Sequence, residues 1–119
     1  MNKARVQHFA EKLEAEKALL EDELNSLGRK DSNGDWEAIP EARTETEGDE
    51  GDQAGRNEEL ESKNARITSL DKRYRQVTAA LERVANGTYG ICLKSGKLIE
   101  EDRLEANPAA ETCKEMMNK

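Results

Sequence analysis

Residues 67–84 read ITSLDKRYRQVTAALERV, and the spacing of their apolar side chains decides the fold. These side chains recur at alternating steps of three and four residues, at Ile67, Leu70, Tyr74, Val77, Leu81 and Val84. Leu60 continues the same series seven residues earlier. Such spacing forms one narrow apolar stripe along a helix, as in a coiled coil. A helix with this stripe needs a partner that covers it.

A second stripe of the same kind lies near the start of the chain. Between Lys3 and Leu27 the apolar residues follow steps of three, four or seven, at Val6, Phe9, Leu13, Leu20, Leu24 and Leu27. Gly28 follows directly and is a suitable C-terminal cap. Two narrow stripes are buried most simply against one another. We therefore predict a mainly α protein in which residues 1–86 form an antiparallel two-helix coiled-coil hairpin.

The composition excludes several classes of protein. The 119 residues include only four aromatic side chains, and 38% are charged against 34% hydrophobic, so a bulky globular core is not expected. The net charge is −7, and residues 31–52 hold nine acidic side chains and a single basic one, Arg43. Direct binding to nucleic acid is therefore not expected.

The location of the protein is inferred from what the sequence lacks. No apolar run approaches the roughly 18 residues that a membrane span needs. The start, MNKARVQHFAEKLEAEK, has no apolar segment of the secretion-signal type. We predict a cytoplasmic protein without a membrane partner, in which Cys92 and Cys113 are thiols rather than a disulfide.

The segment between the two predicted helices, Arg29 to Glu50, is acidic and rich in turn-forming residues, and with the start of the second helix it makes up the predicted tip, about residues 29–54. Asp-Ser-Asn-Gly at 31–34, Pro40 and Gly48 will not continue a helix. We predict a long acidic tip to the hairpin, for which a plain solvated linker is the alternative. Trp36 is expected to pack over its own loop.

The last segment, residues 87–119, predicts a small separate module. Gly87 ends the second helix, Tyr89 to Cys92 is typical of a short strand or turn, and residues 94–97 indicate a tight turn. Short helices are expected from about Glu100 to Glu105 and from Ala109 to Met117. The apolar side chains available for its core are Tyr89, Ile91, Leu98, Ile99 and Leu104.

This module resembles the C-terminal zinc finger of the DksA/TraR family. The matching residues are Gly87-Thr-Tyr-Gly-Ile-Cys92, Gly96, Ile99, Arg103-Leu-Glu-Ala106, Pro108-Ala109 and Thr112-Cys113. The resemblance implies four cysteines, in two C-x-x-C pairs, around one zinc ion. Cys92 and Cys113 stand at the first and third ligand positions, but Ser95 and Met116 stand at the second and fourth. We therefore predict a degenerate finger without zinc or any other cofactor, in which Cys92 and Cys113 are either inert thiols or a redox-labile pair.

The resemblance also gives a meaning to the acidic tip. Family members carry an Asp-x-x-Asp-x-Ala motif that enters the secondary channel of RNA polymerase. The chain has Asp49-Glu-Gly-Asp52-Gln-Ala54, 43 residues before Cys92, which is the separation expected for the family's hairpin. Two carboxylates three residues apart near a helix start lie on one side of that helix. By resemblance, Asp49, Asp52 and Ala54 are the residues that contact the polymerase.

The resemblance implies a bacterial transcription regulator of the stringent-response type that acts on RNA polymerase, and we expect a monomer and not an enzyme. The chain shows no Gly-rich phosphate loop and no nucleophile beside a base, and His8 is its single histidine. A response to guanosine tetraphosphate is not expected, because Asn107 replaces an arginine common in the family. Two alternatives stay open: a structural or adaptor coiled coil that dimerises through the same stripe, and a decoy that occupies the channel without transcriptional output.

Overall fold

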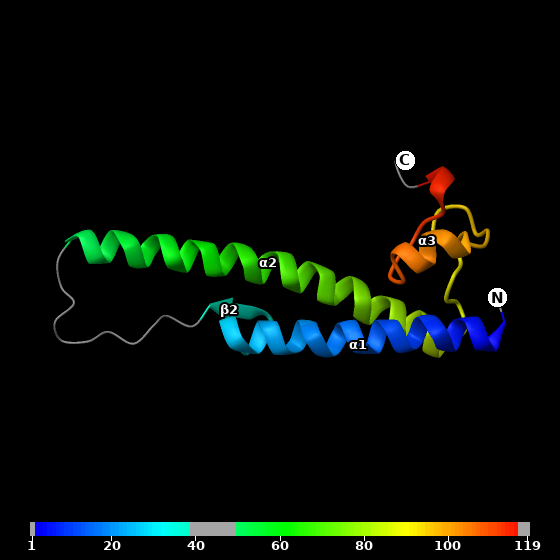
Figure 1. Ribbon diagram of the computed structural model, residues 1–119, viewed down its shortest axis with the longest axis horizontal. Helices are drawn as coiled ribbons and strands as arrows, with labels where there is room; N and C mark the ends of the chain where they lie inside the picture. The colour runs from blue at the N-terminus through cyan, green and yellow to red at the C-terminus, as the bar shows by residue number, and fades with distance from the viewer. Residues whose placement is uncertain (1, 39–49, 117–119) are drawn as a thin grey trace. The chain divides into compact units, whose positions relative to one another are not determined.

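Helices dominate the computed structural model of the chain, which describes residues 2–38 and 50–116, with residues 50–57 described as helix only. Helix α1 spans Lys3–Leu27 and α2 spans Glu50–Asn86, and the strands β1 (Gly28–Lys30) and β2 (Trp36–Ala38) lie between them in sequence (Figure 1). The short helix α3 (Glu101–Ala106) and the 3₁₀ turn η1 (Lys114–Met116) follow. The prediction of a mainly α protein is confirmed. Among the described residues, no helix has the length and apolar character needed to cross a membrane.

Helix α1 has a defined start. The side-chain oxygen of Asn2 accepts a hydrogen bond from the backbone N–H of Arg5 at 2.8 Å, and the Asn2 carbonyl accepts from Val6 at 3.1 Å. A side chain at this position satisfies an N–H group that the first turn of a helix leaves without a partner. The predicted bounds of this helix, Lys3 to Leu27, are those observed.

The two strands form an antiparallel pair that the sequence interpretation did not include. Gly28 pairs with Ala38 and Lys30 with Trp36. In the connecting turn, the Asp31 carboxylate accepts hydrogen bonds from the backbone N–H groups of Asn33 (2.8 Å) and Asp35 (3.0 Å). Asp-Ser-Asn-Gly was correctly interpreted as a helix breaker, but it is also a hairpin turn of the type in which aspartate binds its own backbone.

Helix α2 begins and ends close to where the sequence predicts. Its first residue is Glu50, the last residue of the predicted inter-helix segment, so residues 50–54 of the predicted tip are helical. At the other end, Gly87 has a φ of +77°, and the N–H of Thr88 bonds the carbonyl of Arg83 at 2.9 Å. A glycine with positive φ followed by this bond is a common way to end a helix.

The chain divides into two compact units, and each is described by itself. One unit contains residues 20–73 and the other contains residues 1–19 with 74–119. In the first of these, Leu20, Leu24 and Ile67 are buried, and Arg66 of α2 bonds the Glu23 carboxylate of α1 at 2.9 Å. The end of α1 and the middle of α2 therefore lie side by side within this unit.

The unit of residues 1–19 and 74–119 holds most of the core. The start of α1 lies beside the end of α2, because Val6 and Val84 line the same small cavity. The buried side chains on these helices and in the C-terminal module are Phe9, Ala10, Leu13, Val77, Ala80, Tyr89, Cys92, Ile99, Leu104, Ala109, Ala110 and Cys113. Several of these residues are small, which lets backbones approach closely where bulky aromatic side chains are scarce.

Two expectations about burial were wrong in detail. Along α2, Leu70 and Leu81 are only half-buried, whereas Val77 and Ala80 are fully buried. The predicted stripe contained only bulky residues, but the small side chain of Ala80 is buried as well. In the C-terminal module, Leu98 was expected in the core and is 62% exposed.

The predicted helix from Ala109 to Met117 is also a correction, because within it the described residues contain only the 3₁₀ turn η1. The carbonyl of Glu111 accepts the backbone N–H of Leu93 at 2.8 Å. That carbonyl ties the segment to the loop after Cys92 instead of accepting a helical bond. A further bond, from the N–H of Ala110 to the carbonyl of Asn107 at 3.0 Å, closes a turn around Pro108.

Candidate functional site

A tight turn in the C-terminal module presents the first cysteine. The N–H of Cys92 bonds the carbonyl of Lys97 at 2.8 Å, and the N–H of Gly96 bonds the carbonyl of Cys92 at 2.9 Å. An isolated antiparallel bridge joins Ile91 to Leu98 on either side of this turn. Gly96 has a φ of +74°, which a glycine adopts without a steric penalty. Cys92, in this turn, is buried, at 1% exposure.

The structure brings the two predicted site cysteines together around Ser95. The backbone N–H of Ser95 lies 3.4 Å from Cys92 Sγ, and Ser95 Oγ lies 3.8 Å from Cys113 Sγ. Both cysteines are free thiols and buried. The residue at the second ligand position of the finger therefore contacts both sulfurs.

Local hydrogen bonds favour the ionised form of Cys92. Burial of the thiol opposes ionisation, but the Ser95 side chain and the backbone N–H groups of Cys113, Ser95 and Lys94 donate toward the sulfur. The donors outweigh the burial and lower the pKa of Cys92 to about 6. Backbone N–H groups aimed at a sulfur are a feature of sites in which a thiolate is the ligand or nucleophile.

The turn η1 is held against the start of α3. Glu100 Oε2 accepts the backbone N–H of Lys114 at 3.0 Å, and the Lys114 ammonium pairs with the Asp102 carboxylate. The bond from the Lys114 backbone N–H is the main cause that lowers the pKa of Glu100. At the end of the turn, the N–H of Met116 bonds the carbonyl of Cys113 at 3.0 Å. The segment that carries Cys113 and Met116 is thus fixed to α3.

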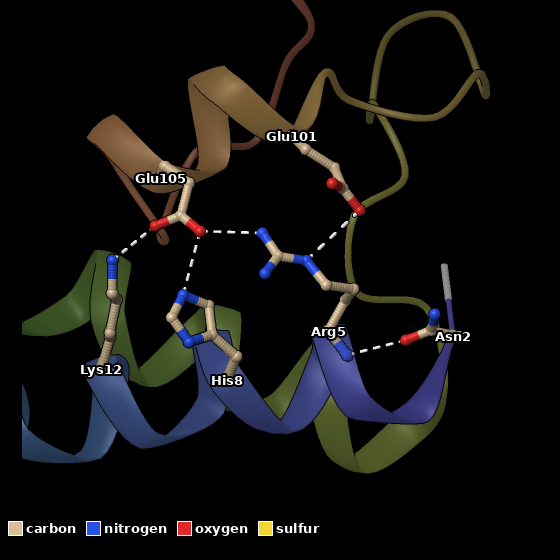
Figure 2. A network of polar contacts seen from close by, with 6 residues as sticks. All are labelled: Asn2, Arg5, His8, Lys12, Glu101 and Glu105. Carbon is tan, nitrogen blue, oxygen red and sulfur yellow. Dashed lines mark hydrogen bonds and ion pairs between the residues drawn. The ribbon is translucent and has the colours of Figure 1, made fainter.

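A second cluster joins α3 to the start of α1, and Figure 2 shows it from close by. Glu105 Oε1 accepts from Arg5 at 2.8 Å and lies 2.9 Å from His8 Nε2, while Glu105 Oε2 accepts from Lys12 Nζ at 2.6 Å. Arg5 also contacts Glu101 at 3.5 Å. The bond from Lys12, followed by that from Arg5, holds the pKa of Glu105 at about 2.

The sequence interpretation did not single out this Glu105 cluster, although a signal was present. Arg5, His8 and Lys12 follow steps of three and four residues, which places them on one helix face. Glu101 and Glu105 are likewise four residues apart on α3. The charge pattern on each helix can be seen in the sequence. The sequence does not show that these two helices pair, so it could not identify Glu105 as the partner of Arg5, His8 and Lys12.

Aromatic contacts reinforce the same junction. The ring of Phe9 lies 6.0 Å from that of Tyr89, centroid to centroid, and the Tyr89 hydroxyl donates to the carbonyl of Pro108 at 2.7 Å. Burial raises the pKa of Tyr89 to about 12. The start of α1 is therefore joined to the C-terminal module by an apolar contact as well as by the Glu105 cluster.

The predicted tip residues are only partly within the description. Asp49 lies outside the described residues. Asp52 and Ala54 lie in the first turns of α2, where only the backbone is described. Their assignment to a partner remains a prediction.

With this geometry established, the chain can be compared with known proteins. Residues 87–115 match the family model of the prokaryotic dksA/traR C4-type zinc finger. The C-terminal module of the chain is therefore similar to the zinc finger of the DksA/TraR family. Transcription factor DksA2 from Pseudomonas aeruginosa is similar over 99% of this chain and 84% of that chain, with 26% identity and a TM-score of 0.73. The DnaK suppressor protein from Agrobacterium tumefaciens C58 is 28% identical, over 97% of this chain and 90% of that chain, with a TM-score of 0.57.

A curated relative is longer than the chain. The uncharacterized protein YteA from Bacillus subtilis (strain 168) is 33% identical over 123 aligned positions, which cover 97% of this chain. The match covers 48% of YteA, so the chain spans about half the length of that relative.

The zinc ligands implied by the DksA/TraR finger are not all present. A closed structural zinc site is built from four cysteine or histidine ligands. Two of the four positions hold Ser95 and Met116, and the Nε2 atom of His8 is engaged by Glu105. Within residues 2–38 and 50–116, no group of three or more His, Cys, Asp or Glu side chains could hold a metal ion. The residues present do not fit tetrahedral zinc.

Proposed function

We propose that this chain is a transcription regulator that binds RNA polymerase. The observation that carries the proposal is the similarity to transcription factor DksA2 over 99% of the chain, together with the family match of residues 87–115. The Cys92, Ser95 and Cys113 contacts support it, because the finger module keeps a compact fold although two ligand positions have changed. The proposed role is regulatory and not enzymatic.

The proposed arm is an antiparallel coiled-coil hairpin made by α1 and α2. Its support comes from each unit separately. In one, Val6 near the start of α1 shares a cavity with Val84 near the end of α2. In the other, Glu23 near the end of α1 pairs with Arg66, which is far from the end of α2. Both contacts have the order that an antiparallel pairing requires.

The tip of this arm is proposed to act in the secondary channel of the polymerase, through Asp49, Asp52 and Ala54. Because α2 begins at Glu50, Asp49 immediately precedes this helix in sequence and Asp52 belongs to its first turn, and a helix dipole favours negative charge near the helix N-terminus. A thin arm can bring these charges among the mobile catalytic elements of the polymerase without itself catalysing a reaction. Ala54 would leave room for close approach.

The decisive test separates binding to RNA polymerase from the effect on transcription. The double variant Asp49→Asn with Asp52→Asn should bind RNA polymerase as the parent does and lose its effect on transcription. Co-purification and an in-vitro transcription assay measure the two properties. The matched control is Glu58→Gln with Glu61→Gln, which removes two exposed charges of the same spacing from α2 and should leave both properties unchanged.

Each of the other possible results would support a different function for this protein. A double Asn variant that regulates transcription as the parent does would remove the tip from the mechanism. Binding without any effect of the parent chain on transcription would identify a decoy. No binding, together with twice the monomer mass by light scattering, would identify an adaptor coiled coil and refute the proposal.

A further inference from the structure

The ligand set of the finger is unsuitable for zinc, but it is a coherent set of soft donors. Cys92 and Cys113 supply sulfur as thiolate and Met116 supplies sulfur as thioether. Thiolates and thioethers are the ligands that select Cu(I), whereas zinc in closed sites requires four firm ligands. Cu(I) is satisfied by two or three soft ligands, since it is a softer ion of lower charge than Zn²⁺.

We propose that Cys92 and Cys113 bind one Cu(I) ion, with Met116 as the third ligand. Both sulfurs contact one residue, because Cys92 Sγ lies 3.4 Å from Ser95 N and Cys113 Sγ lies 3.8 Å from Ser95 Oγ. Both cysteines are buried, at 1% and 4% exposure, so the ion would be shielded from water and oxygen.

Met116 is placed to complete the site. It ends the turn η1, and its N–H bonds the carbonyl of Cys113 at 3.0 Å. In a 3₁₀ turn, residues three apart lie on the same side, so Met116 and Cys113 share a side of this segment. The side chain of Met116 is half-buried.

The remaining candidate ligands are engaged elsewhere. His8 Nε2 lies 2.9 Å from Glu105, and the carboxylates of Glu100 and Asp102 bind Lys114. The proposed coordination is therefore sulfur only. Binding replaces the thiol protons of Cys92 and Cys113 with one Cu⁺, leaves the oxidation state of sulfur and copper unchanged, and releases the protons to solvent.

The test uses the full chain, reduced and free of metal, under anaerobic conditions. The probe is Cu(I) supplied as its coloured complex with a bathocuproine chelator, and the readout is the loss of that colour as the protein takes the metal. We expect one Cu(I) per chain to be removed from the chelator, and Zn²⁺ not to be retained against a zinc chelator of similar strength. Failure of the protein to compete with the chelator would overturn the proposal.

Variants assign the ligands. Loss of an outer-shell partner alone costs about 10-fold to 100-fold in metal affinity, so Cys92→Ser and Cys113→Ser should each weaken binding by more than about 100-fold. Met116→Leu, which keeps volume and apolar character, should weaken it by about 10-fold. The matched control is Met117→Leu, which should bind as the parent does. A loss in Met117→Leu instead of Met116→Leu would overturn the assignment of the third ligand.

A second measurement on the unaltered chain covers the case in which a cysteine variant does not fold. X-ray absorption at the copper edge should show two or three sulfur neighbours and no nitrogen. A nitrogen neighbour would assign the ion to His8 and refute the site. Recovery of a Cys92–Cys113 disulfide with no retained copper would show a redox pair instead of a metal site.

Discussion

Glu105 contacts three side chains of α1 through one carboxylate. It accepts hydrogen bonds from Arg5 and Lys12 and pairs with His8, although its side chain is 39% exposed. Exposed ion pairs usually contribute little each. Three partners on one carboxylate reduce the loss of side-chain freedom per contact, because a single ordered anion serves all of them.

The depressed pKa of Glu105 gives a pH dependence with a defined sign. An acid whose pKa is lowered by folding contributes stability that is fully present above its usual pKa, and this stability is lost as pH falls. For Glu105 the window runs from the usual value of 4.5 down to about 2. Glu105→Gln should therefore lower the thermal midpoint at pH 7, and the difference from the parent should shrink toward pH 2. A pH series of thermal unfolding by circular dichroism measures this, and a difference that is constant with pH would contradict it.

Gly28 is required because there is no space beside its Cα for a side chain. A Cβ atom at this position would lie 2.1 Å from the carbonyl oxygen of Glu37 and 3.0 Å from Ile67 Cδ1. Because the nearest atom belongs to the backbone of β2, the strand pair would have to open. Gly28→Ala should cost about 1–3 kcal/mol in the free energy of unfolding, as overpacking commonly does.

The control for Gly28→Ala is Gly34→Asn. Gly34 has a φ of +84° and nothing within 4 Å of an added Cβ, and asparagine tolerates that backbone conformation. Urea unfolding should rank Gly34→Asn well above Gly28→Ala in stability. Equal losses in the two variants would show that the close approach to Glu37 is not the cause.

At the scale of the elements, α1 shows how far a periodic pattern predicts burial. The stripe correctly identified Phe9, Leu13, Leu20 and Leu24 as core residues, and Leu19, outside the stripe, is 65% exposed. Ala10 and Ala80 are buried although no stripe of bulky residues includes them. A periodic pattern of large side chains locates a face, but it does not show where small residues let a partner approach more closely.

This contrast on one helix gives a controlled stability test. Leu24→Ala removes a fully buried side chain and should lower the free energy of unfolding by about 2–5 kcal/mol. Leu19→Ala makes the same chemical change at an exposed site on the same helix, with the same change in helix propensity, and should stay within about 0.5 kcal/mol. Chemical denaturation followed by circular dichroism measures both. Similar losses at the two sites would refute the assignment of the buried face.

The elements that were missed share a physical cause. The strands β1 and β2 have three residues each, and strands this short carry too few positions for an alternating pattern to be recognised. The segment from Ala109 was predicted to be helical from its composition, but the carbonyl of Glu111 bonds Leu93 across the module. Contacts between residues distant in sequence decided both cases, and no local pattern contains them.

At the scale of the whole molecule, we expect the protein to fold without a metal ion in the finger module. Because Ser95 and Met116 replace two ligands, the purified protein should contain no stoichiometric zinc, and a zinc chelator should leave its circular dichroism unchanged. One zinc per chain by elemental analysis would refute this. The positive control is Ser95→Cys with Met116→Cys, which completes four thiolates and should bind zinc and unfold at a higher temperature when zinc is present.

The sequence predicted the ligand positions of the finger and the meeting of Cys92 with Cys113 through resemblance. It did not predict that Ser95 would contact both sulfurs or that α3 would bind α1 through Glu105. The first depends on backbone N–H directions within a turn, and the second on the pairing of two helices about 90 residues apart in sequence. Residue identity specifies the donors and acceptors, whereas the fold specifies which of them meet.

Three side chains of α1 share the single carboxylate of Glu105, so the two sides of this junction differ in how well they tolerate substitution. The partners of Glu105 stand on neighbouring turns of α1, at positions 5, 8 and 12, so a substitution at any one of them leaves two others on the same carboxylate. The carboxylate side has less redundancy, because among the described contacts of this junction Glu101 pairs with Arg5 alone, at the longer distance of 3.5 Å. Along a lineage, the α1 side of the junction could therefore drift by single steps with little consequence. The α3 side could change only if a new acid appeared within reach first.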